Sequence, residues 1–238
     1  MKFFVLLSFI LAYVSLFAAN AANDQYPHID AKIIGYDEHI AELRKTYSTF
    51  PEDHNNKDWV KSEITYMAMA DHYSVNFASI VFPDYIDPNS PEVVYYMQVF
   101  QPRLQQLLVS NSEMMKELLK TYKWITISEF GKDYDIAAWV LVQHADFDRP
   151  FQKQVLSILE ELYKINETSK ANYAYMYDRL SRADGKLQRY GTQGECRGPM
   201  NWQPFESEDQ ANLDQRRSDM EMDSLAKEIE INNPRCGK

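Results

Sequence analysis

An apolar run in the middle of the chain ends in a group of polar side chains that could carry chemistry. Residues 136–142 are all apolar, and Gln143, His144, Asp146 and Asp148 follow them. A carboxylate four residues after a histidine lies on the same helix face, where it can orient the imidazole as a general base. His144 and Asp148 are therefore the candidate catalytic residues, and they would suit a hydrolase-like enzyme.

The same two side chains also have a purely structural interpretation. Pro150 cannot continue a helix but suits the first turn of a new one, so Asp148 could cap a second helix. His144 and Asp148 would then only complete hydrogen bonds at a helix end. Pairs of this kind are common on helices, so spacing alone favours the structural interpretation.

A second polar group lies downstream, on both sides of Gly191. Amide, hydroxyl and guanidinium side chains that converge near a turn are typical of a ligand-binding surface. Arg179 could reach Asp146 or Asp148 with its planar guanidinium and so join the two groups. The candidate ligand-binding side chains are Gln143, Asp146, Gln152, Asp178, Arg179, Gln188, Tyr190, Thr192 and Gln193.

The motifs give little support to metal, covalent or nucleotide chemistry. A zinc site needs three or four ligands, and spacing places only His144 and Asp148, with Asp178 as a third candidate. The chain has no Gly-x-Ser-x-Gly turn, and Thr192 is a weak nucleophile. It also has no glycine-rich phosphate loop. The sequence therefore indicates no metal and no cofactor.

Three classes of function remain open for these residues. The first is an enzyme that uses His144 as a general base. The second is a domain that binds a small-molecule or peptide ligand without turnover, which is favoured because amides and aromatics outnumber nucleophiles. The third is a structural or interaction domain, in which the motif only holds residues 190–193 against the central helix.

The N-terminus has the composition of a secretory signal peptide. Residues 1–21 contain one lysine, a long apolar core and Ala19-Asn20-Ala21, which predicts cleavage before Ala22. The alternative is an uncleaved membrane anchor, for which the apolar run is at the short end. Cleavage would leave a secreted or periplasmic protein without stable membrane insertion.

Charge and cysteine content agree with export. The net charge of −10 disfavours binding to nucleic acid or to anionic membrane surfaces. In an oxidising compartment, the isolated pair Cys196 and Cys236 is most simply a disulfide, to which the chain-entropy model assigns about 4 kcal/mol. The alternative, a nucleophilic Cys196, would need a neighbour that stabilises the thiolate.

Helical periodicity and only 7 glycines predict a mostly α, single-domain helical fold over residues 22–238. Asp135 is expected to cap the central helix, which should be buried on all sides because residues 136–142 have no polar face. A short extended or loop segment is expected near residues 186–205. The other expected helices are 37–47, 57–79, 92–109, 113–123, 150–165, 169–183, 208–220 and 223–231.

The order of the motifs resembles a bacterial family catalogued only as domain of unknown function 6624, over about residues 95–230. In this sequence the matching motifs are Trp139-x-x-x-Gln143-His-Ala-Asp146, Phe151-Gln152, Asp178-Arg179, Gly185, Gln188 and Tyr190-Gly-Thr-Gln193. Two positions depart from the pattern: Ile125 stands where proline is expected, and Arg149 separates Asp148 from Pro150. The family has no assigned activity, so the resemblance supports the position of the site and implies no chemistry.

Overall fold

The described chain folds almost entirely into helices, which confirms the predicted mostly α fold class. The computed structural model describes residues 25–83, 87 and 89–237. The predicted signal segment, residues 1–21, lies outside the described residues. Among the described helices, none combines the length and the apolar character that crossing a membrane requires.

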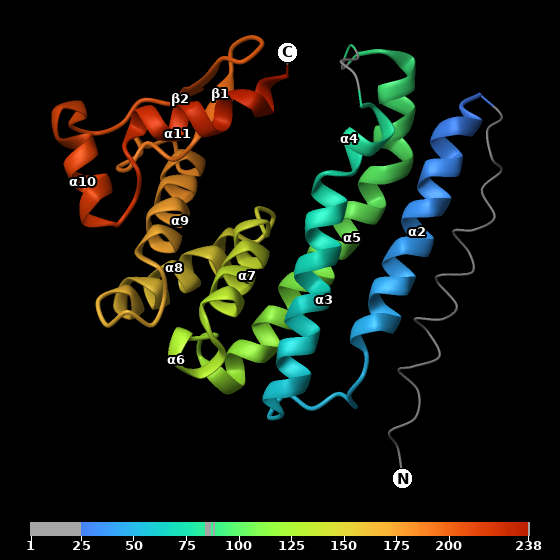
Figure 1. Cartoon of the computed structure of the whole chain (residues 1–238), viewed down its shortest axis with the longest axis horizontal. Coiled ribbons are helices and arrows are strands. Elements are labelled where there is room, and N and C mark those ends of the chain that lie inside the picture. Colours follow the sequence, from blue (N-terminus) through green and yellow to red (C-terminus); the bar gives the residue numbers. More distant parts are fainter. Residues whose placement is uncertain (1–24, 84–86, 88, 238) are drawn as a thin grey trace.

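Three long helices form the N-terminal part of the molecule, and both α2 and α5 pack against α3 (Figure 1). They are α2 (Pro27–Tyr47), α3 (Lys57–Val75) and α5 (Pro91–Tyr122), with the short α4 (Phe77–Val81) before α5. α2 begins well before the predicted start at residue 37. Its additional turns carry Ile29, Ile33 and Tyr36, which are buried in one aromatic cluster with Phe77.

α5 is one continuous helix of 32 residues, so the predicted break between residues 109 and 113 is wrong. Pro102 lies inside the helix, where proline disturbs the preceding turn. The Arg103 side chain donates to the Val99 carbonyl in this turn at 2.8 Å. Ser112, which lies in the predicted gap between the helices 92–109 and 113–123, is fully buried within α5. Burial of the α5 face on both sides of Pro102 outweighs the local cost of proline.

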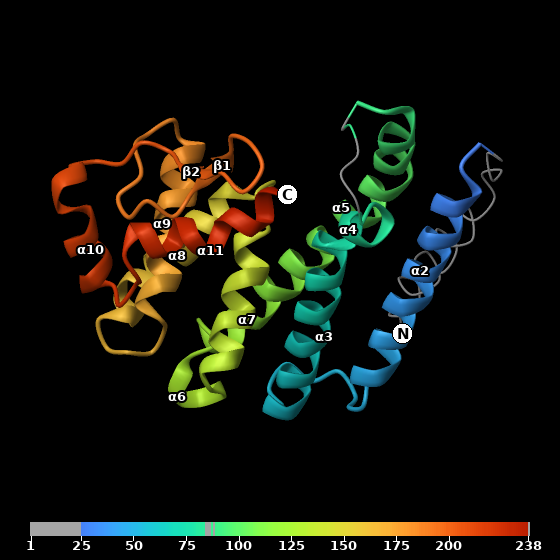
Figure 2. The same ribbon diagram turned by 45° about the horizontal axis from the view of Figure 1, so that its top comes forward.

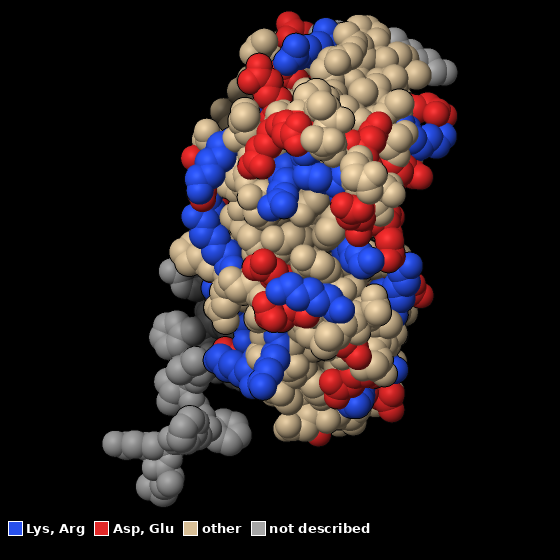
Figure 3. Space-filling model, turned by 90° about the vertical axis from the view of Figure 1, so that its left-hand side faces the viewer, with Lys and Arg blue, Asp and Glu red and all other residues tan. Residues whose placement is uncertain are grey.

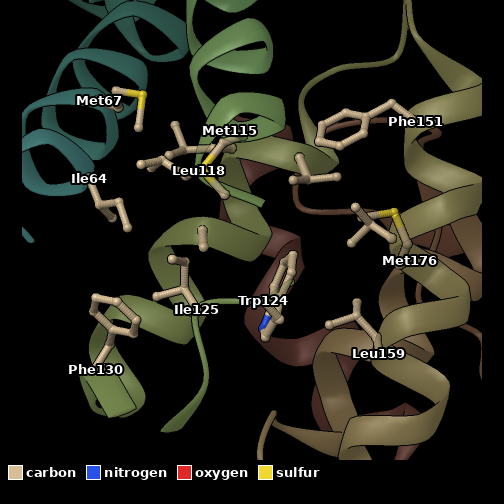
Figure 4. Close-up of a cluster of buried hydrophobic side chains, with 14 of the residues drawn as sticks. Ile64, Met67, Met115, Leu118, Trp124, Ile125, Phe130, Phe151, Leu159 and Met176 are labelled. Atoms are coloured by element: carbon tan, nitrogen blue, oxygen red, sulfur yellow. The ribbon is translucent and has the colours of Figure 1, made fainter. Parts of the chain in front are cut away.

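The central helices are α6 (Ile127–Phe130), α7 (Lys132–Gln143), α8 (Arg149–Tyr163) and α9 (Lys170–Ala183). They share one apolar core with α3 and α5 (Figure 4). The prediction that α7 is buried on all sides is wrong, because Ile136 is 37% exposed. The core side chains drawn and labelled in Figure 4 are Ile64, Met67, Met115, Leu118, Trp124, Ile125, Phe130, Phe151, Leu159 and Met176.

Asp135 joins the central helices, although not as the predicted cap of α7. The N-cap of α7 is Gly131, and Asp135 lies one turn later, fully buried. Its carboxylate accepts hydrogen bonds from Trp124 Nε1 (2.8 Å), Thr168 Oγ1 (2.7 Å) and Asn172 Nδ2 (3.0 Å). Burial raises the pKa of Asp135, and these hydrogen bonds oppose the rise. One carboxylate thus fixes the start of α7 against the start of α9.

The C-terminal part folds back over α9 (Figure 2). Within the segment expected to be extended or loop, near residues 186–205, lies the antiparallel pair β1 (Gly194–Cys196) and β2 (Trp202–Pro204). The remaining elements are η1 (Gln210–Asn212), α10 (Leu213–Asp219), α11 (Leu225–Asn232) and η2 (Asn233–Cys236). Gly194 is required in β1, because a Cβ there would lie 2.4 Å from the ring of Trp202.

The molecular face shown in Figure 3 carries charged side chains of both signs in alternation. Exposed ion pairs such as Lys153–Asp184 (2.9 Å) and Lys164–Glu161 (2.9 Å) each contribute only about 0–1 kcal/mol. The face in Figure 3 has no continuous basic stripe of the kind that binds nucleic acid.

Candidate functional site

One buried carboxylate holds the loop of residues 188–193 in place. Asp178, on α9, accepts hydrogen bonds from the backbone N–H groups of Arg189 (2.6 Å), Tyr190 (3.1 Å) and Thr192 (3.0 Å). The Thr192 hydroxyl donates to the same carboxylate at 3.0 Å. Burial raises the pKa of Asp178, and these hydrogen bonds oppose the rise. Because Asp178 is fully buried, it positions the loop and is not accessible to a ligand.

The loop can turn this sharply because residue 191 is glycine. Gly191 has a φ of +69°, and a Cβ there would lie 3.1 Å from the Leu225 side chain. Gln188 closes the loop: its amide donates to the Gln193 carbonyl at 2.9 Å and accepts from the Gln193 N–H at 2.8 Å. Gln188 is fully buried and Tyr190 is 6% exposed, so both belong to the framework of the site. Burial raises the pKa of Tyr190 to about 12.

Arg179 binds Asp146 in the two-pronged geometry that its sequence position suggested. Arg179 Nε lies 2.8 Å from Asp146 Oδ1, and Nη2 lies 2.5 Å from Oδ2. Burial acts to raise the pKa of Asp146, but the hydrogen bond and charge of Arg179 outweigh it and lower the pKa. Gln152, buried in α8, donates to Asp146 at 3.2 Å and to the Gln143 carbonyl at 2.9 Å. These contacts fix the end of α7 against α8 and α9.

His144 pairs with Asp71 rather than with Asp148. Its Nδ1 lies 2.6 Å from Asp71 Oδ2, and Asp71 is 1% exposed on α3. α7 ends at Gln143, so His144 and Asp148 do not share a helix face. Asp148 caps α8 by accepting from the Phe151 N–H at 3.1 Å, and it binds Lys116 at 2.6 Å. Asp148 therefore caps a helix, as in the structural interpretation of the sequence. The carboxylate beside His144 is that of Asp71.

A cavity of about 480 Å³ lies between the end of α7, α9 and the C-terminal segment. Four of the predicted ligand-binding side chains line it: Gln143, Arg179, Thr192 and Gln193. The other lining residues are Ala171, Tyr175, Gly194, Trp202, Glu221, Met222, Asp223, Glu228, Ile231, Asn232 and Arg235. The loop of residues 188–193 therefore does face the tip of the central helix across a cavity.

The amide of Gln143 is the polar group in this cavity that lacks a partner. Its Oε1 is buried and has no hydrogen-bond partner among the described residues. In contrast, the Gln193 amide donates to the Thr192 hydroxyl at 3.0 Å. Buried polar atoms in folded proteins are almost always hydrogen-bonded, so a buried acceptor without a partner in a cavity wall indicates where a ligand donor could bind.

The opposite wall is held by Glu228 of α11. Its carboxylate accepts from the Tyr175 hydroxyl (2.8 Å), from Arg217 Nη2 (2.9 Å) and from Asn232 Nδ2 (3.0 Å). Arg217 is fully buried and also donates to the Tyr190 carbonyl at 2.7 Å. Burial raises the pKa of Tyr175, with the neighbouring Glu228 acting in the same direction. This network connects α9, the 188–193 loop and α11 around the cavity.

The predicted disulfide between Cys196 and Cys236 is present, with a Cα–Cα distance of 5.4 Å. It ties η2 to β1, and the Trp202 N–H donates to Asn233 Oδ1 at 2.9 Å beside it. Arg235, the residue before Cys236, lines the cavity. The disulfide therefore keeps the C-terminal wall of the cavity closed, and Cys196 is not a free nucleophile.

Residues 99–237 match the model of a family of unknown function, DUF6624. The chain belongs to this family. No curated protein and no solved structure matches the chain. The DUF6624 match begins within α5, so it contains the whole wall of the 480 Å³ cavity. Asp71 and the helices α2 to α4 lie before it, which places the partner of His144 outside the matched DUF6624 region.

The predicted site residues divide into two groups in this DUF6624 protein. Asp178, Gln188, Tyr190 and Gln152 are buried framework residues, whereas Gln143, Arg179 and Gln193 face the cavity. Thr192 belongs to both groups, because it lines the cavity and its hydroxyl donates to Asp178. The candidate catalytic residues His144 and Asp148 are not among the residues that line it. Asp146 touches the cavity only through its ion pair with Arg179.

Sequence reasoning missed two kinds of residue. Asp71 was overlooked because it precedes His144 by 73 positions, although it follows Ile64 and Met67 at helical spacing and so falls on the buried face of α3. Glu228 lies in the predicted helix of residues 223–231, and Trp202 lies in the predicted extended or loop segment, but neither was selected as a site residue. The contact of Glu228 with Tyr175 of α9 joins residues 53 positions apart, so the local sequence gives no sign of it.

Proposed function

We propose that the cavity between α7, α9 and α11 binds a small polar molecule or the end of a peptide. The observation that carries the proposal is the buried amide oxygen of Gln143, which has no partner among the described residues. Leaving a buried acceptor unpaired costs about 1–3 kcal/mol. Because this oxygen is buried behind the cavity surface, a rotation of the Gln143 amide would have to turn it toward the cavity, where a ligand N–H or O–H group would remove this cost. The ligand is therefore expected to carry a hydrogen-bond donor.

The size and charge of the cavity narrow the class of ligand. Its volume of about 480 Å³ falls within the range of small-molecule sites, about 300–1,000 Å³. Arg179 and Arg235 line it together with Glu221 and Asp223. Because both signs of charge surround the same space, a neutral polar or zwitterionic ligand fits better than a polyanion.

The residues that hold the loop are largely different from those that face the cavity, and this supports ligand binding over a purely structural role. Asp178 and Gln188 hold the loop and are fully buried, so the loop does not need the side chains of Gln143 and Arg179, which face the cavity from α7 and α9. If the motif were only scaffolding, Gln143 would be expected to bond to protein groups and the space beside it to be filled.

The test compares the full mature chain with the Gln143→Leu variant, and with Gln215→Leu as a matched control on the exposed surface of α10. Thermal-shift screening against polar metabolites and short peptides should find a ligand that stabilises the wild type and Gln215→Leu. Loss of one hydrogen bond should weaken its binding to Gln143→Leu up to about tenfold. Equal affinity for all three proteins would contradict the proposal.

The second candidate function is an enzyme in which His144 is the general base. It is favoured by the 2.6 Å contact between His144 Nδ1 and the buried Asp71, which leaves Nε2 as the proton acceptor. The His144 side chain is 23% exposed, so its ring can meet solvent. In a hydrolase-like reaction Nε2 would take a proton from an attacking water, and Asp71 would hold the ring and stabilise the imidazolium.

Mass spectrometry of the ligand recovered after incubation separates the two candidates, because only an enzyme changes it chemically. If turnover is found, His144→Ala and Asp71→Asn should abolish it. Asp148→Asn should retain it, since Asp148 binds Lys116 and not His144. Loss of turnover in Asp148→Asn with normal unfolding would contradict the assignment of Asp71.

We also infer that the protein works outside the cytoplasm, as a secreted or periplasmic protein. The inference rests on the signal-like composition of residues 1–21 and on the disulfide between Cys196 and Cys236. Intact mass measurement of the protein from its native host should give a chain that starts at Ala22 and carries no free thiol. A chain that starts at Met1 would contradict cleavage.

A further inference from the structure

One wall of the cavity of about 480 Å³ is formed by α11 together with the residues at its two ends. Asp223 lies just before α11, and Arg235 lies in η2, just after it. Glu228 and Asn232 of α11 line the cavity between them. Figure 1 shows α11 leading from the side of α10 to the C-terminus. The 8 residues of this helix rise about 12 Å, so Asp223 and Arg235 lie at opposite ends of a wall of about this length.

Most of the charged side chains around this cavity already have a partner of opposite charge. Glu228 binds the buried Arg217 at 2.9 Å, and Glu221 binds Lys170 at 2.7 Å. The guanidinium of Arg179 is neutralised by the carboxylate that it binds at the end of α7. These lining residues therefore need no charged group from a ligand.

Asp223 and Arg235 are the two charged lining residues that differ. Within the part of the chain that the structure describes, neither side chain takes part in an ion pair or a hydrogen bond, and Asp223 accepts from Arg217 only through its backbone carbonyl. Both residues are exposed, so their charges are accessible to a ligand. Burial raises the pKa of Tyr175 in the same cavity, and the charge of Arg235 opposes the rise, so this charge acts on the cavity.

We propose that the ligand of this cavity is a short peptide of three or four residues with both ends free. Its amino group would bind Asp223, and its carboxylate would bind Arg235, whose planar guanidinium suits a carboxylate. This inference rests on the proposed binding function of the cavity and names the class of its ligand.

The length of the peptide follows from the length of the wall. An extended chain spans at most about 3.3–3.6 Å per residue, so three or four residues span about 10–14 Å and match a wall of about 12 Å. A free amino acid is too short to reach both Asp223 and Arg235. A much longer peptide would leave one of its charged ends outside the cavity.

The experiment is isothermal titration calorimetry of the full chain with three peptides of equal length. Trialanine carries both charges, trialanine amide lacks the carboxylate, and N-acetyl-trialanine lacks the ammonium group. Trialanine should bind in a saturable way. Each blocked peptide should bind about fivefold more weakly, the ratio that corresponds to an exposed ion pair of about 1 kcal/mol. Free alanine should bind more weakly than trialanine, because it cannot reach both charges.

Two variants assign each end of the peptide to a residue. Arg235→Gln should bind trialanine about fivefold more weakly and should bind trialanine amide like the wild type. Asp223→Asn should likewise lose affinity for trialanine but not for N-acetyl-trialanine. The matched controls Arg197→Gln and Asp219→Asn, at exposed positions that do not line the cavity, should bind all three peptides like the wild type.

Two results would overturn this inference. One is no binding of trialanine at millimolar concentration. The other is an equal loss of affinity for all three peptides in Arg235→Gln or Asp223→Asn, which would mean that the variant distorts the wall. The thermal-shift screen with Gln143→Leu tests the proposed function separately. A ligand that depends on Gln143 but on neither Asp223 nor Arg235 would retain the binding cavity and reject the peptide.

Discussion

The imidazole of His144 and the carboxylate of Asp71 meet at 2.6 Å, although 73 residues separate them in the chain. The contact joins the end of α7 to the C-terminal part of α3, so it connects the DUF6624 region to the helices that precede it. Asp71 is 1% exposed, and its second oxygen, Oδ1, has no partner among the described residues. The carboxylate therefore depends on His144 for its pairing.

This dependence predicts a large effect of removing the imidazole. His144→Ala should destabilise the protein by about 2–3 kcal/mol, because it leaves the buried Asp71 carboxylate without its partner. His72→Ala, an exposed histidine next to Asp71 on α3, is the control and should change stability by less than about 0.5 kcal/mol. Urea unfolding at neutral pH measures both.

The double variant Asp71→Asn/His144→Ala tests whether the two residues act as a pair. If they do, its free energy of unfolding should exceed the value expected from the two single variants by about 1 kcal/mol or more. Additive effects would mean that His144 contributes through packing alone and that the contact with Asp71 has little energetic weight.

The contact between Asp148 and Lys116 predicts a pH-dependent contribution to stability. The Lys116 hydrogen bond lowers the pKa of Asp148, with burial opposing it. A carboxyl whose pKa is lower in the folded state stabilises the fold above its unfolded pKa of about 4, and this stabilisation is lost as the pH falls through the folded pKa. Acid should therefore remove whatever Asp148 contributes by charge.

Asp148→Asn isolates this charge, because asparagine can still cap α8. At pH 7 the variant should be less stable than the wild type by up to about 1 kcal/mol. In urea titrations the difference should begin to shrink as the pH falls below about 4 and should vanish only below the lowered folded pKa of Asp148. Asp148→Ala, which also loses the cap bond to the Phe151 N–H, should cost about 1 kcal/mol more. A difference between wild type and Asp148→Asn that is the same at all pH values would contradict the ion pair.

Two glycines with positive φ allow a matched test of how tightly the 188–193 loop packs. Gly185 and Gly191 have φ of +72° and +69°, so alanine at either position costs about 1–2 kcal/mol of backbone strain. Only at Gly191 would the new Cβ also meet neighbours, the side chains of Leu225 at 3.1 Å and Leu213 at 3.3 Å. Gly191→Ala should therefore cost about 1 kcal/mol more than Gly185→Ala in urea unfolding. Equal costs would mean that the two leucines move aside freely.

Sequence patterns were sufficient to predict that the end of the central helix and the 188–193 loop come together, but not the hydrogen bonds between them. The polar tip after residues 136–142 and the glycine turn at residue 191 do face each other across a cavity, as their polar composition suggested. However, a residue that lines a cavity and a buried residue that holds the cavity wall in place can be of the same amino-acid type. Gln143 and Gln188 are both glutamines, and only the coordinates separate the unpartnered one from the fully bonded one.

The errors in the predicted fold have a common physical cause, which is that burial outweighs local preference. Two helices were predicted over residues 92–109 and 113–123, but α5 is continuous through both, because its apolar faces on both sides of Pro102 are buried. Asp135 had the residue type of an N-cap, but it lies inside α7 because three side-chain donors from other segments converge on it. Neither the burial nor the donors can be read from the local sequence.

Removing the disulfide should loosen the C-terminal wall of the polar cavity more than the rest of the molecule. Cys196 and Cys236 are 40 residues apart, and the chain-entropy model gives about 4 kcal/mol for a loop of this length. The variant Cys196→Ser/Cys236→Ser should lose stability of this order, and hydrogen exchange should rise first in residues 194–205 and 225–237. Dithiothreitol should have the same effect on the wild type and none on the double variant. The Arg217–Glu228 contact still attaches α11 to α10 without the disulfide, so the loss of order should stay local. An equal rise in hydrogen exchange over the whole chain would contradict this local role.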